Sequence, residues 1–455
     1  MISIAEVAEA VENVLTVTAS TLARPSGFVQ RASKLSGSLF AKTLVLGWLE
    51  NSNASLSELC QVTAELGVSL SPQGLEARFD KGAVAFFEQL LGAAVTKLLA
   101  ADRVAIPILW RFSAVILEDS TVIGLPDALV EYWQGTGERT GHNQAALKLQ
   151  VRLDFLTGCL FGPLLQDGRA QDKTSPLKDR ALPEGSLHLA DLGFFVLEQL
   201  KAESAATVYW LRRLPVSVVV FDVSTDQVST DQDGVRWELW RLLEAKRAQG
   251  ADRLDLLVRL GLEAQLDARL LAVRVPKEVA DERRRKLHVE ARHKGQTVSQ
   301  ARLKLCDWTV LVTNCPVELL SLDEALVLAR VRWQIELLFK LWKSEGLRDW
   351  SSSAKPLRIL CEVYAKLLGL LLQHWLLLLS CWQRPEKSLT KAAATVRFNV
   401  ALLIVALKGL FDLQTALEQI RSTIALGCRM TPRRKKPNAY QLLLNLPVPA
   451  EVPLA

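Results

Sequence analysis

The sequence lacks the cysteine and histidine patterns that build zinc or redox sites. Its seven cysteines are scattered, odd in number and free of any CxxC pair, which indicates neither a disulfide framework nor a zinc site. Its five histidines show no HExxH or clustered spacing, which argues against a zinc hydrolase. Any catalytic chemistry is therefore expected from other side chains.

Features of export and of membrane insertion are also missing. The first residues, MISIAEVAEAVENVL, carry acids and have no basic stretch followed by an apolar run, so we expect no signal peptide. The Leu-rich run from Leu367 to Trp382 is short and is interrupted by Gln373 and His374, so we interpret it as a buried core helix. We therefore expect a cytoplasmic protein with no membrane partner.

Length and charge set only broad limits. The 455 residues have room for roughly two to four domains, each with its own core. Lys and Arg outnumber Asp and Glu by 55 to 49, which permits a polyanionic partner without requiring one.

Residues 1–105 are predicted to be helical and to contain a helix-turn-helix. One helix is expected to end before Gly67, and a second to begin with Ser71 as N-cap and Pro72 in its first turn. Solvation is an equal alternative for the basic and amide side chains here. The candidate DNA-binding residues are Arg31, Lys34, Gln73, Arg78 and Lys81.

Residues 106–222 change to short β-rich runs separated by turn residues. Residues 223–305 interrupt this pattern with a tandem VSTDQ repeat, typical of a tolerated surface insertion. A strand and then one long helix follow, in which Ser321 and Glu324 form a capping box and Gly346 offers a stop. Residues 386–455 are predicted helical, with a basic tract of Arg433, Arg434, Lys435 and Lys436 as a further DNA-binding candidate.

Three acidic residues stand out within this organisation. Asp119 and Asp191 each occur where a predicted strand ends. Glu336 shares one face of the long helix with three cations, and a solvated, ion-paired stripe is the alternative interpretation of that face. The three cations are Arg332, Lys340 and Lys343.

Neighbouring residues receive simpler interpretations. By strand alternation, Glu118 is expected to face away from Asp119. Asp222 is interpreted as a turn former. Three tryptophans are interpreted as core residues in preference to surfaces that stack on bases: Trp333, Trp342 and Trp350.

The long helix, SLDEALVLARVRWQIELLFKLWKS, resembles the YREK signature of bacterial insertion-sequence DDE transposases. Arg332, Glu336 and Lys343 match its spacing, whereas Ala329 occupies the Tyr position. EDSTVIGLP and ADLGFF resemble the two aspartate motifs of that family, and GFVQRASKLSG and SPQGLEARF are also similar to it. The resemblance extends over nearly the whole chain.

The resemblance implies a mixed α/β fold with an RNase H-like catalytic core. The core is expected over residues 106–222 and 306–385, with a β-rich insertion at 223–305. A helical DNA-binding domain is expected at 1–105 and a helical C-terminal region at 386–455. The 145 residues between Asp191 and Glu336 leave room for such an insertion.

It also implies an activity and partners. Asp119, Asp191 and Glu336 would be catalytic and hold two Mg2+ or Mn2+ ions, which prefer oxygen ligands. Arg332, Lys340 and Lys343 would contact DNA phosphates. The implied function is cut-and-paste transposition at terminal inverted repeats and target DNA, by a homodimer associated with the nucleoid.

Two other functions remain open. An RNase H-like nuclease would use the same metal site without strand transfer. A catalytically impaired transposase that only binds DNA is favoured by Ala329, which offers neither ring nor hydroxyl. We hypothesise that hairpin formation at the transposon end is weakened by this residue.

Overall fold

The computed structural model describes residues 2–31, 33–137, 144–223, 235–347, 353, 355–431 and 437–446. The chain forms two compact units. Unit 1 comprises Met1–Ile106, Asp119–Asp179 and Trp333–Tyr440, and unit 2 comprises Pro107–Glu118, Arg180–Arg332 and Gln441–Ala455. The boundary falls within strand β1 (Val115–Leu125), between Glu118 and Asp119.

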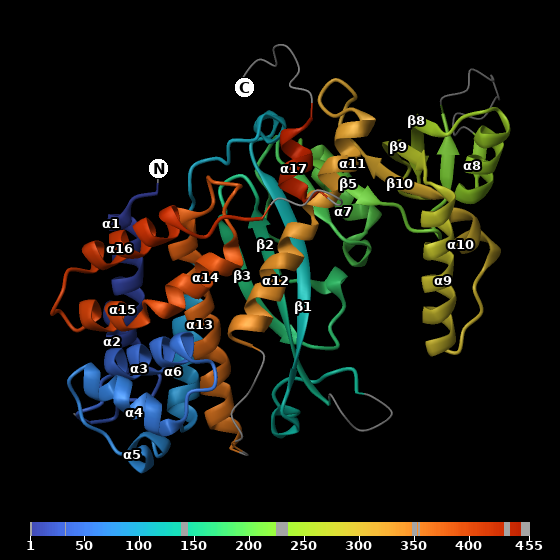
Figure 1. The fold of residues 1–455 in the computed structure, drawn as a ribbon. Helices are drawn as coiled ribbons and strands as arrows, with labels where there is room; N and C mark the ends of the chain where they lie inside the picture. The colour runs from blue at the N-terminus through green and yellow to red at the C-terminus, as the bar shows by residue number, and fades with distance from the viewer. Residues whose placement is uncertain are drawn as a thin grey trace. The chain divides into compact units, whose positions relative to one another are not determined.

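Unit 1 is mainly helical (Figure 1). Its helices are α1 (Ile4–Glu12), η1 (Asn13–Thr18), α2 (Ala19–Leu22), α3 (Gly37–Glu50), α4 (Leu56–Glu65), α5 (Pro72–Glu76), α6 (Lys81–Val95), η3 (Asp127–Leu129), η4 (Asp172–Thr174), α12 (Trp333–Glu345), α13 (Pro356–Ser380), α14 (Leu389–Phe398), α15 (Val400–Leu407) and α16 (Leu413–Leu426). Its strands β2 (Ala145–Asp154) and β3 (Leu160–Asp167) pair antiparallel, and the strand order is β3-β2-β1. Helix α17 (Ala439–Leu444) crosses the unit boundary.

Helix α13 is the core of unit 1. It packs against α3 and α6, and its side chains are buried from Ile359 to Leu378 around its whole circumference. A helix that is apolar all round must be enclosed by protein or by lipid. Its length and composition would suit a membrane span, but 94% of its apolar window is buried inside the protein. The interpretation of the Leu-rich run as a core helix is confirmed.

Unit 2 holds most of the sheet. Its strands follow the order β1-β4-β5-β10-β9-β8-β6-β7. They are β4 (Leu187–Ala190), β5 (Tyr209–Arg213), β6 (Val220–Asp222), β7 (Val235–Trp237), β8 (Arg253–Leu260), β9 (Leu266–Arg274) and β10 (Trp308–Thr313). Its helices are η2 (Pro107–Arg111), η5 (Leu192–Phe194), α7 (Leu197–Ala205), α8 (Leu239–Ala248), α9 (Lys277–His293), α10 (Gln300–Leu305) and α11 (Leu322–Val331).

The pairing directions make the sheet mixed. β1 with β4 and β4 with β5 are parallel, whereas β5 with β10, β10 with β9 and β9 with β8 are antiparallel. The predicted mixed α/β fold is confirmed, and β1 to β5 supply the five-stranded mixed core that an RNase H-like domain requires.

The segment of the predicted β-rich insertion, 223–305, holds helices as well as strands. Its described residues contain helices α8, α9 and α10 as well as strands β7, β8 and β9. β8 and β9 pair along their whole length and join the sheet through β10, so the segment extends the core sheet and makes no separate β domain. The two compact units likewise do not follow the predicted domain boundaries.

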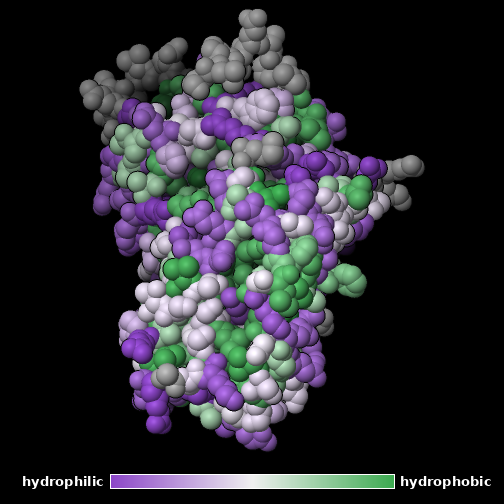
Figure 2. All heavy atoms as spheres, turned by 90° about the vertical axis from the view of Figure 1, so that its left-hand side faces the viewer, coloured by the Kyte–Doolittle hydropathy of each residue, from purple (hydrophilic) through white to green (hydrophobic). Residues whose placement is uncertain are grey.

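The surface of the helical unit is patchy. Figure 2 shows hydrophobic side chains gathered between hydrophilic ones on the face at the left of Figure 1. Among the exposed apolar side chains of unit 1 are Phe398, Leu410 and Leu426, with exposed fractions of 89%, 69% and 86%. These side chains contribute little to the core.

We predict opposite effects on stability when two glycines of α6 are replaced by alanine. A Cβ added at Gly82 would lie 2.7 Å from the backbone carbonyl carbon and oxygen of Gly27, whereas a Cβ at the exposed Gly92 meets nothing within 4 Å. We expect Gly82→Ala to lower the free energy of unfolding, because backbone must move. Gly92→Ala, its matched control, should raise it by about 0.5 to 1 kcal/mol through helix propensity. Urea denaturation measures both, and equal shifts would contradict the packing of α6 on Gly27.

Candidate functional site

Asp119 lies inside a strand. β1 continues to Leu125, and its alternate residues Thr121, Ile123 and Leu125 are buried. The prediction that Asp119 closes its strand is therefore wrong. The Asp119 side chain is half-buried, and its Oδ1 accepts a hydrogen bond of 2.8 Å from the Ser120 amide.

A polar cluster holds the residue after Asp119. The Ser120 hydroxyl donates to Asp172 Oδ1 at 2.6 Å, and Lys148 Nζ lies 3.0 Å from the same oxygen. Lys148 also donates to the carbonyl oxygen of Ala170. The sequence interpretation missed Asp172 and Lys148, since only the fold brings η4 beside β1 and β2. The feature of the sequence that could have indicated this cluster is Lys148, a charged residue on the buried strand β2.

Asp191 follows a strand, as predicted. β4 ends at Ala190, and Asp191 caps the short helix η5, with its side chain 43% exposed. Arg332 Nη2 lies 3.8 Å from Asp191 Oδ1. Arg332 therefore forms an ion pair with Asp191.

The register of β1 and β4 relates the two aspartate motifs. Glu118 pairs with Ala190 in this parallel ladder. Asp119 and Asp191 are the next residues of their respective chains. Glu118 is 1% exposed, whereas Asp119 is half-buried, as expected if the two side chains point to opposite faces.

Glu336 lies on α12, and the predicted single long helix is two helices. The predicted capping box of Ser321 and Glu324 opens α11, but α11 ends at Val331 with Arg332 as its C-cap. Helix α12 therefore begins at Trp333, after Arg332. Glu336 is half-buried.

The face of α12 around Glu336 is open to solvent. Lys340 and Lys343 are exposed, and Lys340 Nζ lies 4.7 Å from the centre of the Trp333 ring. Trp333 is 47% exposed, so its interpretation as a core residue is wrong, whereas Trp342 is buried as predicted. Trp350 lies outside the described residues.

The predicted site residues are divided between the two units. Asp119, Glu336, Lys340 and Lys343 belong to unit 1, and Asp191 and Arg332 to unit 2. Within the described part of the chain, no three His, Cys, Asp or Glu side chains are grouped to hold a metal ion.

A buried charge cluster includes Glu118, the residue before Asp119, and His188, three residues before Asp191. Both ring nitrogens of His188 face carboxylates, with Nε2 3.0 Å from Glu118 Oε2 and Nδ1 3.0 Å from Glu203 Oε1. The Arg212 guanidinium donates to the His188 carbonyl oxygen and lies 3.8 Å from Glu203 Oε2. These four side chains are at most 9% exposed. The cluster joins β1, β4, β5 and α7.

A second buried carboxylate of unit 2, that of Asp222, also lies beside a cation. Asp222 is not a turn former but the last residue of β6, and it is 3% exposed. Its Oδ2 lies 3.0 Å from Lys246 Nζ on α8. The ion pair explains a charge at this buried position.

The helix-turn-helix prediction is confirmed in its two helices but not in the length of the second. Ser71 caps α5, with Pro72 in its first turn, yet α5 spans only Pro72–Glu76 because Asp80 caps the next helix, α6. Gln73 is thus on α5, Arg78 follows its end, and Lys81 opens α6.

The exposure of these side chains leaves them available to a partner. Arg31, Lys34, Gln73 and Lys81 are exposed and Arg78 is half-buried. The basic tract Arg433, Arg434, Lys435 and Lys436 lies outside the described residues.

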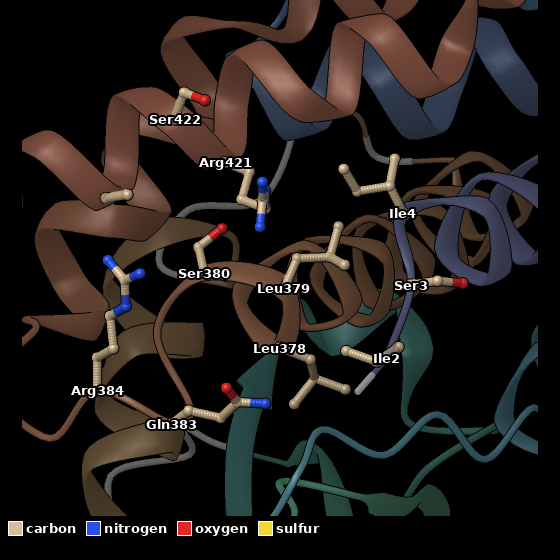
Figure 3. A pocket seen from close by; sticks show the side chains of 11 residues that line it. Ile2, Ser3, Ile4, Leu378, Leu379, Ser380, Gln383, Arg384, Arg421 and Ser422 are labelled. Carbon is tan, nitrogen blue, oxygen red and sulfur yellow. The ribbon is translucent and has the colours of Figure 1, made fainter.

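A cavity of about 430 Å³ lies elsewhere in unit 1. Figure 3 shows Ile2 and Ile4 on one side of it and Arg384 and Arg421 on the other. Arg421 is already bonded to Glu418 at 2.7 Å. Neither Asp119 nor Glu336 lines this cavity, so it is separate from the candidate site.

Comparison with known families gives a match over more than half of the chain. A family model described as "Transposase DDE domain" matches residues 110–372. This range includes Asp119, Asp191 and Glu336.

Curated relatives align over nearly the whole chain. The transposase for insertion sequence element IS231B of Bacillus thuringiensis subsp. berliner is 26% identical over 443 residues, which cover 93% of this chain and 91% of that protein. The transposase for IS231C from the same organism is 28% identical, over 85% of this chain and 84% of that protein. The transposase for IS1151 of Clostridium perfringens is 24% identical, over 93% and 92%.

The buried cluster predicts a large loss of stability on substitution. His188→Ala would leave Glu118 and Glu203 buried without the imidazole, and breaking such a cluster costs about 3 to 5 kcal/mol. Chemical denaturation should show a loss of this size. The control Arg241→Ala, which removes an exposed pair with Glu238, should change stability by less than about 1 kcal/mol. Similar losses in both variants would contradict a structural role for the cluster.

Proposed function

The chain belongs to the family of DDE-domain transposases, and we propose that Asp119, Asp191 and Glu336 are the carboxylates with which it cleaves and joins DNA at the ends of an insertion sequence. The single observation that carries this assignment is the register of β1 with β4, which pairs Glu118 with Ala190. The two aspartates follow these paired residues directly, Asp119 within β1 and Asp191 just after the end of β4.

A second chain connection supports Glu336. Arg332 lies 3.8 Å from Asp191, and Glu336, in the first turn of α12, follows Arg332 by four residues in the chain. Glu118, which precedes Asp119, thus pairs with the residue before Asp191, and Arg332, which precedes Glu336 by four residues, contacts Asp191 itself. Catalysis requires the three carboxylates to converge when DNA is bound.

The donor set fits divalent metal ions. Members of this family generally use such ions. All three side chains are carboxylates with solvent access, and hard Mg2+ or Mn2+ prefers oxygen ligands over nitrogen or sulfur. Two bound ions would supply an activated hydroxyl nucleophile and stabilise the leaving oxygen.

The neighbouring cations suit phosphate binding. Lys340 and Lys343 are exposed on the helix that carries Glu336, where their charges offset those of the scissile strand. Partial desolvation lowers the pKa of Lys343. The half-exposed Trp333 ring beside Lys340 offers a surface on which a base can stack.

The proposed partners follow from the reaction. Joining a mobile segment to new DNA requires terminal inverted repeats, a target duplex and two synapsed ends, so two copies of the chain are proposed to act together. Exposed Arg31, Lys34, Gln73 and Lys81 are the proposed contacts in the N-terminal helices, to DNA in the nucleoid.

The assignment of Glu336 predicts a separation of binding from cleavage. Glu336→Gln keeps the size of the side chain but removes its charge, so cleavage of a transposon-end duplex with Mg2+ should fall at least about 100-fold. Binding of the same duplex should persist.

Glu318→Gln is the matched control, because Glu318 is an exposed carboxylate outside the proposed site. It should cleave at the wild-type rate. Wild-type cleavage by Glu336→Gln would remove Glu336 from the triad. Cleavage without joining by the wild-type chain would favour a nuclease, and binding alone a catalytically impaired relic.

Because Ala329 stands at the Tyr position of the signature, we predict that hairpin formation is impaired. Ala329→Tyr restores the ring and hydroxyl of the signature on α11, where residue 329 is half-buried. Hairpin product from a nicked transposon-end substrate should increase, with Ala329→Phe as a control that supplies the ring alone. No gain with Tyr would contradict the hypothesis that this residue weakens end processing.

A further inference from the structure

The positive charge of the chain is concentrated in one short segment of unit 2. Residues 283–304 contain eight Lys or Arg side chains and a single acid, Glu290, a formal charge of +7. The whole 455-residue chain carries only +6, so all other residues together are slightly negative. The segment comprises most of α9 and α10 and the connection between them.

Two of these cations anchor α9 to the sheet. Arg283 donates to the Trp308 carbonyl oxygen at 2.7 Å and to Thr309 Oγ1 at 3.0 Å. Arg284 lies 2.7 Å from Asp307, just before β10. These contacts hold α9 to the sheet, because the helix itself buries only Ala280 and Ala291. Most of the helix surface therefore faces solvent, as Figure 1 shows where α9 extends beyond β9 and β10.

Two other arginines have no such structural use. Arg285 and Arg292 are exposed, and neither forms an ion pair with any residue that the structure describes. By contrast, Lys286 on the same helix and Lys294 at its C-cap pair with Glu282 and Glu290 at 2.6 Å. Residues seven apart share a helix face, so Arg285 and Arg292 point the same way.

We propose that the face of α9 carrying Arg285 and Arg292 is a docking surface for the phosphate backbone of duplex DNA. The two residues are about 10 Å apart along the helix axis, close to the rise of three nucleotides of one strand. Phosphate contacts carry no sequence information, so binding through Arg285 and Arg292 to the backbone is independent of sequence. The proposal rests on the proposed function only in that DNA is the substrate.

The test is DNA affinity over a range of salt concentrations. In the full chain, Arg285→Gln/Arg292→Gln should bind on the order of tenfold more weakly at 0.1 M salt and reduce the salt slope by about 1.8, or about 0.9 for each lost phosphate contact. The loss should be the same for a transposon-end duplex and for a duplex of unrelated sequence.

The matched control removes two charges elsewhere in unit 2. Arg241→Gln/Arg253→Gln alters exposed arginines that pair with Glu238 and Asp323, and it should keep wild-type affinity and slope. Equal losses in both double variants would assign the effect to net charge and overturn the proposal. Unchanged binding of the α9 variant would also overturn it and would favour an acidic protein as partner of this face.

The binding result is independent of the triad. Cleavage that requires Glu336, together with unchanged binding by the α9 variant, would refute the α9 surface and leave the transposase assignment intact. Weakened binding by the α9 variant, together with cleavage that does not require Glu336, would support the α9 surface and refute the assignment of Glu336 to the triad. Equal melting temperatures of the variants confirm that the fold is retained.

Discussion

The parallel pairing of β1 with β4 is the contact on which the proposed chemistry depends. It aligns Glu118 with Ala190, so the residues that follow are Asp119 within β1 and Asp191 just after β4. A slip of one residue would exchange the faces of Glu118 and Asp119, because side chains alternate along a strand. His188 opposes such a slip, because its Nε2 lies 3.0 Å from Glu118 and its Nδ1 lies 3.0 Å from Glu203.

The charged side chains of this protein serve two different purposes, and burial separates them. Buried Arg212 and partly buried Lys246 neutralise buried carboxylates within unit 2, where an uncompensated charge would be costly. Exposed Lys343 and Arg285 have no such duty and keep their charge available to an anionic partner. The same division exists within α9, where Arg283 anchors the helix and Arg285, two positions later, faces solvent.

Local features could be predicted from the sequence because their causes are local. The capping box of Ser321 and Glu324 and the N-cap at Ser71 involve atoms three residues apart, and both form. Features that depend on distant partners were predicted poorly. β1 extends past Asp119, where alternate residues are buried, and α5 is short because Asp80 starts a new helix. Trp333 is exposed although its spacing matched a packed face.

By itself, the sequence determined the order and spacing of the acidic motifs and, through them, the family of the chain. It also determined the mixed α/β class, because the change from helical to alternating periodicity is encoded within each segment. The tertiary structure decided which carboxylates are buried in clusters and which remain accessible. Burial depends on neighbours far apart in the chain, as with Glu118 and Glu203, and periodicity within one segment carries no information about them.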